Sequence, residues 1–164
     1  MGYTHYLRRP KTLNKTKFKL VLKDMELFMK SNLHKLVGRV WFVKGGDGTG
    51  EPIFTEDLIC FNGMQSALED LSHETMYVER VMEPHRWQTP EKGKYFEFCK
   101  TARKPYDILV CLCLLSLKEH FGDKVEISSD GDRDDWENAI KAYEEITKRK
   151  VSEKFLRGQD ELQS

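Results

Sequence analysis

The sequence has no net charge and no long apolar run, and each absence excludes a class of partner. Its 164 residues contain 27 lysines and arginines against 27 aspartates and glutamates. A protein that grips a long nucleic acid needs a basic face, so no such partner is expected. The longest near-continuous apolar run covers residues 108–117, about half of the ~20 residues that a membrane-spanning helix requires. The sequence therefore predicts no membrane association either.

Cysteine is present, but without the spacing of a metal or redox motif. The four cysteines form no CxxC pair, and Cys111 and Cys113 lie inside the apolar run, where cysteine behaves as a small hydrophobic residue. His5, His73 and Cys99 show no metal-ligand spacing, so no metal site is predicted. The first six residues lack the apolar core of a signal peptide. We therefore expect a reduced, cytoplasmic protein.

The order of apolar and polar residues predicts one α+β domain over residues 1–150, followed by a polar tail over 151–164. Helices are expected at 15–30, capped by Asn14 or Thr16, at 105–121, ending at Gly122, and after Asp132 or Asp134. Strands are expected at 36–43, 55–61, 76–82 and 125–127, with a turn at 62–63 and a short helix at 153–157. The helix over 105–121 is apolar all round, which predicts a small sheet packed around a central buried helix. An α/β arrangement is the alternative.

Three cations precede this central helix, at Lys100, Arg103 and Lys104, with Thr101 between them. The start of a helix already carries partial positive charge, so an anion should compensate. That anion is either a carboxylate of the chain, at Asp107, Asp130 or Asp132, or a bound ligand on the free backbone N–H groups.

A glycine-rich loop over residues 45–52 is a second candidate site. Gly46, Asp47 and Gly48 lie in it, and glycine lets backbone N–H groups point into one concavity, as in phosphate cradles. The loop lacks the Gly-Lys-Ser/Thr of a P-loop, and the acidic side chains favour ribose hydroxyls or a cation over phosphate. A mobile surface loop is the alternative.

Two polar clusters, His73-Glu74 and Asp130-Gly131-Asp132, can supply acid–base chemistry or metal ligands. No EF-hand follows Asp130, because position 141 is Lys141 where that loop needs Glu. A turn with a helix cap is the simpler interpretation of the second cluster.

Aromatic and thiol groups lie near the same segments. Tyr3 and Tyr6 flank His5 at the beginning of the chain, and aromatic faces beside cations are typical of sites that hold a planar ring. Cys99 beside Lys100 is a candidate nucleophile, with ordinary packing as the alternative.

The chain resembles a family of small proteins found in bacteriophages and bacterial genomes that begin Met-Gly-Tyr-Thr-His-Tyr. The resemblance is carried by the first six residues and by further segments, while Leu7 departs from it, because relatives are expected to have Trp there. These segments are 45–52, 58–63, 73–75, 98–107 and 128–132 ahead of Trp136. The resemblance implies no activity, but it implies that the polar segments form one site, and a phage origin makes sequestration of a host nucleotide signal a reasonable hypothesis.

These observations predict a cytoplasmic protein that binds a small anionic, nucleotide-like ligand, with no cofactor assigned. The alternative is a hydrolase or transferase acting on a nucleotide-like substrate, with His73, Glu74 or Asp130 as base or metal ligand. The binding function is favoured because no nucleophile, base and orienting group can be recognised together. An interaction protein without a small ligand is the third candidate.

Overall fold

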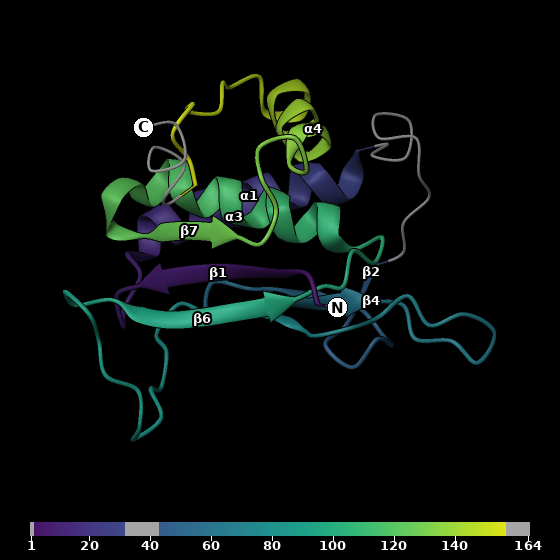
Figure 1. Ribbon diagram of the computed structural model, residues 1–164, viewed down its shortest axis with the longest axis horizontal. Coiled ribbons are helices and arrows are strands. Elements are labelled where there is room, and N and C mark those ends of the chain that lie inside the picture. The colour runs from purple at the N-terminus through teal and green to yellow at the C-terminus, as the bar shows by residue number, and fades with distance from the viewer. Residues whose placement is uncertain (1, 32–42, 157–164) are drawn as a thin grey trace.

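A computed structural model describes residues 2–31 and 43–156 and shows a single α+β domain (Figure 1). Its described helices are α1 (Lys15–Lys30), α3 (Asp107–Phe121) and α4 (Glu137–Thr147), with a short 3-10 turn at Gly122–Lys124. The strands form two sheets in which every strand pairing is antiparallel. The predicted α+β class is confirmed, and the α/β alternative is wrong because it requires parallel strands.

Helix α1 begins and ends at the predicted residues. Asn14 is its N-cap, and the Asn14 Oδ1 accepts a hydrogen bond from the Lys17 backbone N–H at 3.0 Å, which satisfies one of the first-turn donors. The buried face carries Phe18, Val21 and Phe28, which recur at the spacing of one helix side.

Helix α3 is the centre of the core, as predicted. Ten of its 15 residues are buried, and it packs against α1, α4 and strand β7 (Glu126–Ser129). It ends at Gly122, whose φ of 57° lies in the left-handed region that glycine adopts without a steric penalty. None of the described helices has the length and apolar character needed to cross a membrane.

The first sheet has the order β6-β1-β7, with β1 (Thr4–Arg9) between β6 (Tyr95–Lys100) and β7 (Glu126–Ser129). The strand predicted over 125–127 is confirmed from Glu126 onward as β7, and Val125 is buried just before it. Strands β1 and β6 were not predicted. In β1 the buried residues include His5 and Arg9, so the inward face does not show as an alternation of apolar and polar residues.

The second sheet is centred on β4 (Leu58–Gly63), which pairs with β2 (Val43–Lys44), β3 (Ile53–Phe54) and β5 (Met76–Glu79). The strand predicted over 55–61 begins only at Leu58, because the preceding residues form a turn in which the Thr55 N–H donates to the Leu58 carbonyl. The predicted turn at 62–63 is wrong, because both residues continue β4. Gly63 is required there by close packing, since a Cβ would overlap the Leu71 carbonyl oxygen. The strand predicted over 36–43 lies outside the described residues except for Val43.

The segment before α4 is a capped turn rather than a capped helix start. The Asp132 Oδ1 accepts from the Asp135 N–H at 3.1 Å, and the Asp135 Oδ2 accepts from the Asp132 N–H at 3.0 Å. The N-cap residue of α4 itself is Trp136, without a side-chain cap, so the prediction that Asp132 or Asp134 caps this helix is wrong. The predicted apolar stripe is confirmed at Trp136, Ala139, Ile140 and Tyr143, which are buried.

Residues 151–156 return to the core after α4. Phe155 is buried with its ring centroid 5.3 Å from that of Trp136, and Leu156 forms a parallel bridge with Ile127 of β7. The described part of the helix predicted over 153–157 is a turn followed by this bridge, so that prediction is wrong.

Candidate functional site

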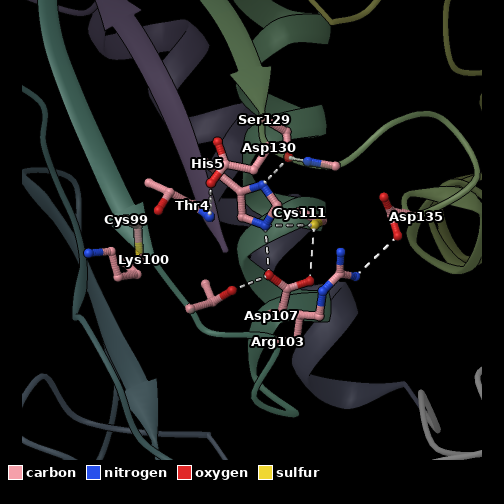
Figure 2. Close-up of polar contacts among 12 residues, drawn as sticks. Thr4, His5, Cys99, Lys100, Arg103, Asp107, Cys111, Ser129, Asp130 and Asp135 are labelled. Atoms are coloured by element: carbon pink, nitrogen blue, oxygen red, sulfur yellow. Dashed lines mark hydrogen bonds and ion pairs between the residues drawn. The ribbon is translucent and has the colours of Figure 1, made fainter. Parts of the chain in front are cut away.

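His5 lies at the centre of a buried polar network between β1, β7 and the start of α3 (Figure 2). Its side chain has no exposed surface, and its ring makes edge contacts with Tyr3 and Trp136 at centroid distances of 4.9 and 5.1 Å. The His5 Nδ1 is 2.8 Å from the Ser129 Oγ, and the Nε2 is 2.6 Å from the Asp107 Oδ1. Both ring nitrogens therefore have partners, as a buried histidine requires.

Asp107 brings together the groups around the start of α3. It is the first residue of that helix, where a carboxylate is stabilised by the helix dipole. Its Oδ1 accepts from the Thr101 hydroxyl as well as contacting His5, and its Oδ2 lies 3.6 Å from the Cys111 Sγ. The Cys111 Sγ is also 3.6 Å from the His5 Nε2. Three side chains from two elements thus converge on one point, as Figure 2 shows.

The Ser129, His5 and Asp107 side chains include the residue types of a serine hydrolase triad, but their arrangement differs. In that triad the imidazole Nε2 faces the nucleophilic serine and the Nδ1 faces the aspartate. Here the Nδ1 faces Ser129 and the Nε2 faces Asp107. The Ser129 Oγ also accepts from the Gly131 N–H at 2.9 Å, which holds the hydroxyl in place beside the imidazole. We interpret Ser129 as a group that orients His5.

A polar cavity opens next to this network, between the beginnings of α3 and α4. Its wall includes Tyr3, Arg103, Lys104, Asp107, Cys111, Asp135 and Asn138. Both helices begin at this cavity, so the positive ends of two helix dipoles face it. Its charged side chains are two cations and two carboxylates, so a bound ligand would contact both positive and negative charges.

Arg103 is the most exposed cation of the cavity and is held from two sides. Its guanidinium carbon lies 3.9 Å from the ring centroid of Tyr3, and its Nη1 donates to the Asp135 Oδ1 at 3.1 Å. The hydrogen bond that Arg103 donates to Asp135 raises the pKa of Arg103. The pKa of Asp135 is lowered by the Asp132 backbone N–H and then by Arg103. The carboxylate beside Arg103 is therefore Asp135, and not one of the three predicted partners.

The turn that carries Arg103 has an uncommon backbone conformation. Ala102 and Arg103 have φ values of 51° and 58°, in the left-handed region that disfavours residues with a Cβ. The Tyr3 carbonyl accepts the N–H groups of Thr101 and Ala102, at 3.0 and 3.2 Å. Such strain persists only where the surrounding contacts enforce it, and here they direct the side chain of Arg103 over the Tyr3 ring.

Of the predicted cations, Lys104 lies in the cavity wall and its Nζ donates to the Asp70 carbonyl at 2.8 Å. Lys100 ends β6, and its backbone rather than its ammonium makes the described contacts. The Lys100 N–H donates to the Glu74 Oε2 at 2.7 Å, and the Lys100 carbonyl lies 2.9 Å from the His73 Nδ1. Among the described residues, the cavity wall includes neither His73 nor Glu74.

Asp130, which follows β7, accepts hydrogen bonds from residues at the beginning of β1. Its Oδ2 accepts from the Thr4 N–H at 3.0 Å, and its Oδ1 accepts from the Tyr6 hydroxyl at 2.8 Å. The Tyr6 ring stacks on Phe96 at 5.7 Å, on the sheet face opposite His5. Asp132 closes the turn already described. Tyr3 is the one predicted aromatic residue that lies in the cavity wall.

The glycine-rich loop is a loop, as predicted, but it packs elsewhere. The Gly46 carbonyl accepts from the Asn62 Nδ2 at 3.2 Å and from the Thr75 hydroxyl. The Asp47 Oδ1 accepts from the N–H and hydroxyl of Thr49 within the loop, and the Gly48 carbonyl accepts from the Gln65 N–H. The structure therefore brings together Tyr3, His5, Thr101, Arg103 and Lys104, and leaves this loop beside β4.

The Cys99 thiol is buried, and burial raises its pKa to about 12, with further effects from Glu74 and Asp107. A nucleophilic cysteine needs a thiolate at neutral pH, so the structure favours ordinary packing for Cys99.

Cys111, Ser129 and Asp135 were not predicted as site residues, and Asp107 was predicted only as an ion-pair partner. One signal was present: Asp107 and Cys111 are four residues apart, which places them on one side of a helix. Their contact with His5 depends on the unpredicted strand β1.

Comparison of the chain with protein-family models, with curated proteins and with solved structures found no match. The resemblance to small bacteriophage and bacterial proteins therefore stays a prediction.

Proposed function

We propose that the chain binds a small anionic ligand, of the size and charge of a nucleotide phosphate, in the cavity between the beginnings of α3 and α4. The observation that carries this proposal is the Arg103 guanidinium, which is fixed over the Tyr3 ring at the cavity while its side chain stays 61% exposed. An arginine held in place loses little further conformational freedom when it binds an anion.

The surroundings of Arg103 support an anionic ligand. Lys104 adds a second cation to the same wall, and two helix beginnings add positive potential. The contact with Asp135 uses Nη1, and a guanidinium carries further N–H donors on Nη2 and Nε that suit the paired oxygens of a phosphate. Asp107 and Asn138 supply polar groups for a less charged part of the ligand, such as a hydroxyl.

The proposal is tested by titration calorimetry of the wild-type chain with inorganic phosphate and with adenosine and guanosine mono- and triphosphates, with adenosine as the uncharged control. We expect at least one phosphate compound to bind and adenosine not to bind. Loss of a charge-assisted contact is worth about 1.5–3 kcal/mol, so Arg103→Ala should weaken binding by about 10- to 100-fold.

Arg8→Ala is the matched control. Arg8 also lies over an aromatic ring, 5.0 Å from the Phe96 centroid, and also pairs with a carboxylate, that of Glu91, but it lies outside the cavity. Equal affinity of both variants for the phosphate compound, or no binding of any probe at millimolar concentration, would contradict the proposal.

A further inference from the structure

The strongest unexplained feature of the molecule is the convergence of an imidazole, a carboxylate and a thiol. Their ligand atoms, on His5, Asp107 and Cys111, all lie within 4.8 Å of one another. We propose that these three side chains bind a divalent transition-metal ion, with zinc as the ion that best suits one nitrogen, one oxygen and one sulfur ligand.

Two of the three distances between the ligand atoms match a tetrahedral ion. Zinc–sulfur bonds of about 2.3 Å and zinc–nitrogen bonds of about 2.0 Å separate the two ligand atoms by about 3.5 Å. The Cys111 Sγ lies 3.6 Å from both the His5 Nε2 and the Asp107 Oδ2. The separation of 2.6 Å between the His5 Nε2 and the Asp107 Oδ1 is shorter because a hydrogen bond joins them, and an ion would replace that bond.

Neighbouring side chains orient the ligands as they do in known metal sites. A histidine ligand usually donates its second N–H to an oxygen that fixes the ring. With the ion on Nε2, the proton of the neutral ring lies on Nδ1 and donates to the Ser129 Oγ, which is 2.8 Å away. The Asp107 carboxylate is fixed in turn by the Thr101 hydroxyl, a residue with no exposed surface.

Charge also favours an ion at this point. Binding of a divalent cation displaces the Cys111 thiol proton to solvent, so the ion, one thiolate, one carboxylate and one neutral imidazole sum to zero. A neutral cluster avoids the cost of burying a net charge.

A second cluster, of Asp24, Glu119 and His120, shows why ligand types alone do not suffice. It also places three ligand atoms together. There, however, the Arg149 guanidinium already neutralises the carboxylates. Its Nη2 lies 2.6 Å from the Asp24 Oδ2, and its Nε lies 2.7 Å from the Glu119 Oε1. Within the described chain, no lysine or arginine nitrogen lies at ion-pair distance from Asp107. Of the two clusters, the one around His5 is therefore the one in which a metal ion can supply the positive charge.

The ion would be reached from the polar cavity, because Asp107 and Cys111 lie in its wall. Three protein ligands and a fourth position open to a cavity are typical of catalytic zinc sites. The metal site rests on its three ligands alone and does not require the anionic ligand proposed above. Metal binding is therefore measured without any phosphate compound, and either proposal can fail without the other.

The test uses the full chain, freed of metal by a chelator and then titrated with Co²⁺ and with Zn²⁺ in competition with a chromogenic chelator. We expect one equivalent to bind, with the intense near-ultraviolet absorption of a cobalt–thiolate bond. Cys111→Ser should abolish that absorption and weaken zinc binding by more than about 100-fold. Cys113→Ser is the matched control, since it makes the same substitution at a buried cysteine two residues along the same helix, and it should leave both unchanged.

If Cys111→Ser does not fold, X-ray absorption of the zinc-loaded wild-type chain decides. One sulfur at about 2.3 Å with the remaining ligands nitrogen or oxygen is the expected result. No stoichiometric binding, a cobalt complex without thiolate absorption, a shell without sulfur, or equal loss in both cysteine variants would overturn the proposal.

Discussion

Tyr3 contacts Arg103 through its ring and the two residues before Arg103 through its backbone carbonyl. The Tyr3 carbonyl accepts two N–H groups of the turn that carries Arg103, and the Tyr3 ring lies 3.9 Å below the guanidinium. The residue directly before β1 thus determines where the side chain of Arg103 points. The Tyr3 hydroxyl packs closely against the backbone of Gly131, where a Cβ would overlap the hydroxyl oxygen.

The first prediction separates the charge of Arg103 from its shape. Arg103→Lys keeps the charge but loses the planar fork that stacks on Tyr3 and binds two phosphate oxygens. We expect affinity for the phosphate compound to fall about 10-fold, in proportion to one lost charge-assisted contact. The free energy of unfolding should change by less than about 1 kcal/mol, because the pair with Asp135 is largely exposed. Calorimetry and urea unfolding measure the two quantities, and a large loss of stability with unchanged affinity would make Arg103 a purely structural residue.

The sequence predicted those parts of the fold that depend on local periodicity. Helix α1 and the centre of α3 follow from apolar spacing, and their ends follow from Asn14 and Gly122. Strand β1 could not be predicted in this way, because its inward face includes a histidine and an arginine. The Arg9 guanidinium donates to the carbonyls of residues 10, 11, 79 and 80, contacts that only the folded chain provides.

The candidate site was predicted only in part, because some of its contacts exist only in the folded chain. The importance of the segment before α3 is visible in its charges, and Arg103 and Lys104 do lie at the cavity. Asp135 and Cys111 join them only through packing of α4 and β1 beside α3. His73, Glu74 and Asp130 are polar residues whose contacts at strand ends account for their positions, and sequence alone does not separate such a role from catalysis.

A second prediction concerns the core. Leu112 has no exposed surface and lies in the middle of α3. Leu112→Ala removes buried methyl groups and leaves a cavity, so the free energy of unfolding should fall by about 2–5 kcal/mol. Leu27→Ala in α1 is the control, because Leu27 is 47% exposed and its loss should cost less than about 1 kcal/mol. Urea unfolding of both variants measures the difference, and equal costs would contradict the central position of α3.

A third prediction is a pH dependence that arises from Asp24. Burial raises the pKa of Asp24, but hydrogen bonds from His120, Ser116 and Arg149 outweigh burial and lower it below its ordinary value of 3.8. A group with a lowered pKa in the folded state stabilises the protein above its ordinary pKa. That stabilisation is lost as the pH falls through the lower, folded-state pKa.

Asp24→Asn should therefore be less stable by about 3 kcal/mol at neutral pH, and the difference from wild type should narrow as the pH falls below about 4. Asp57→Asn is the control, because the Asp57 side chain is 84% exposed. Chemical unfolding between pH 7 and pH 3 gives the curves. A difference that stays constant over this range would show that the charge of Asp24 contributes nothing.

The last prediction uses the backbone strain beside Arg103. Ala102 has a φ of 51°, and a residue with a Cβ pays about 1 kcal/mol or more in this region, whereas glycine does not. Ala102→Gly should therefore stabilise the free protein by about 0.5 kcal/mol, after the greater entropy of glycine in the unfolded chain is subtracted. The same substitution at the exposed Ala67, whose φ is not positive, should destabilise it slightly.

Ligand binding should respond in the opposite direction to stability. The strained turn holds the Arg103 guanidinium over Tyr3, and glycine at position 102 gives that turn more conformations, so binding must then restrict them. Ala102→Gly should weaken binding of the phosphate compound about threefold or more while raising the melting temperature. Ala67→Gly should leave the affinity unchanged. A site that depends on a fixed Arg103 cannot gain backbone freedom at residue 102 without losing affinity. Higher stability together with unchanged affinity would therefore mean that the strained conformation of Ala102 has only a structural role.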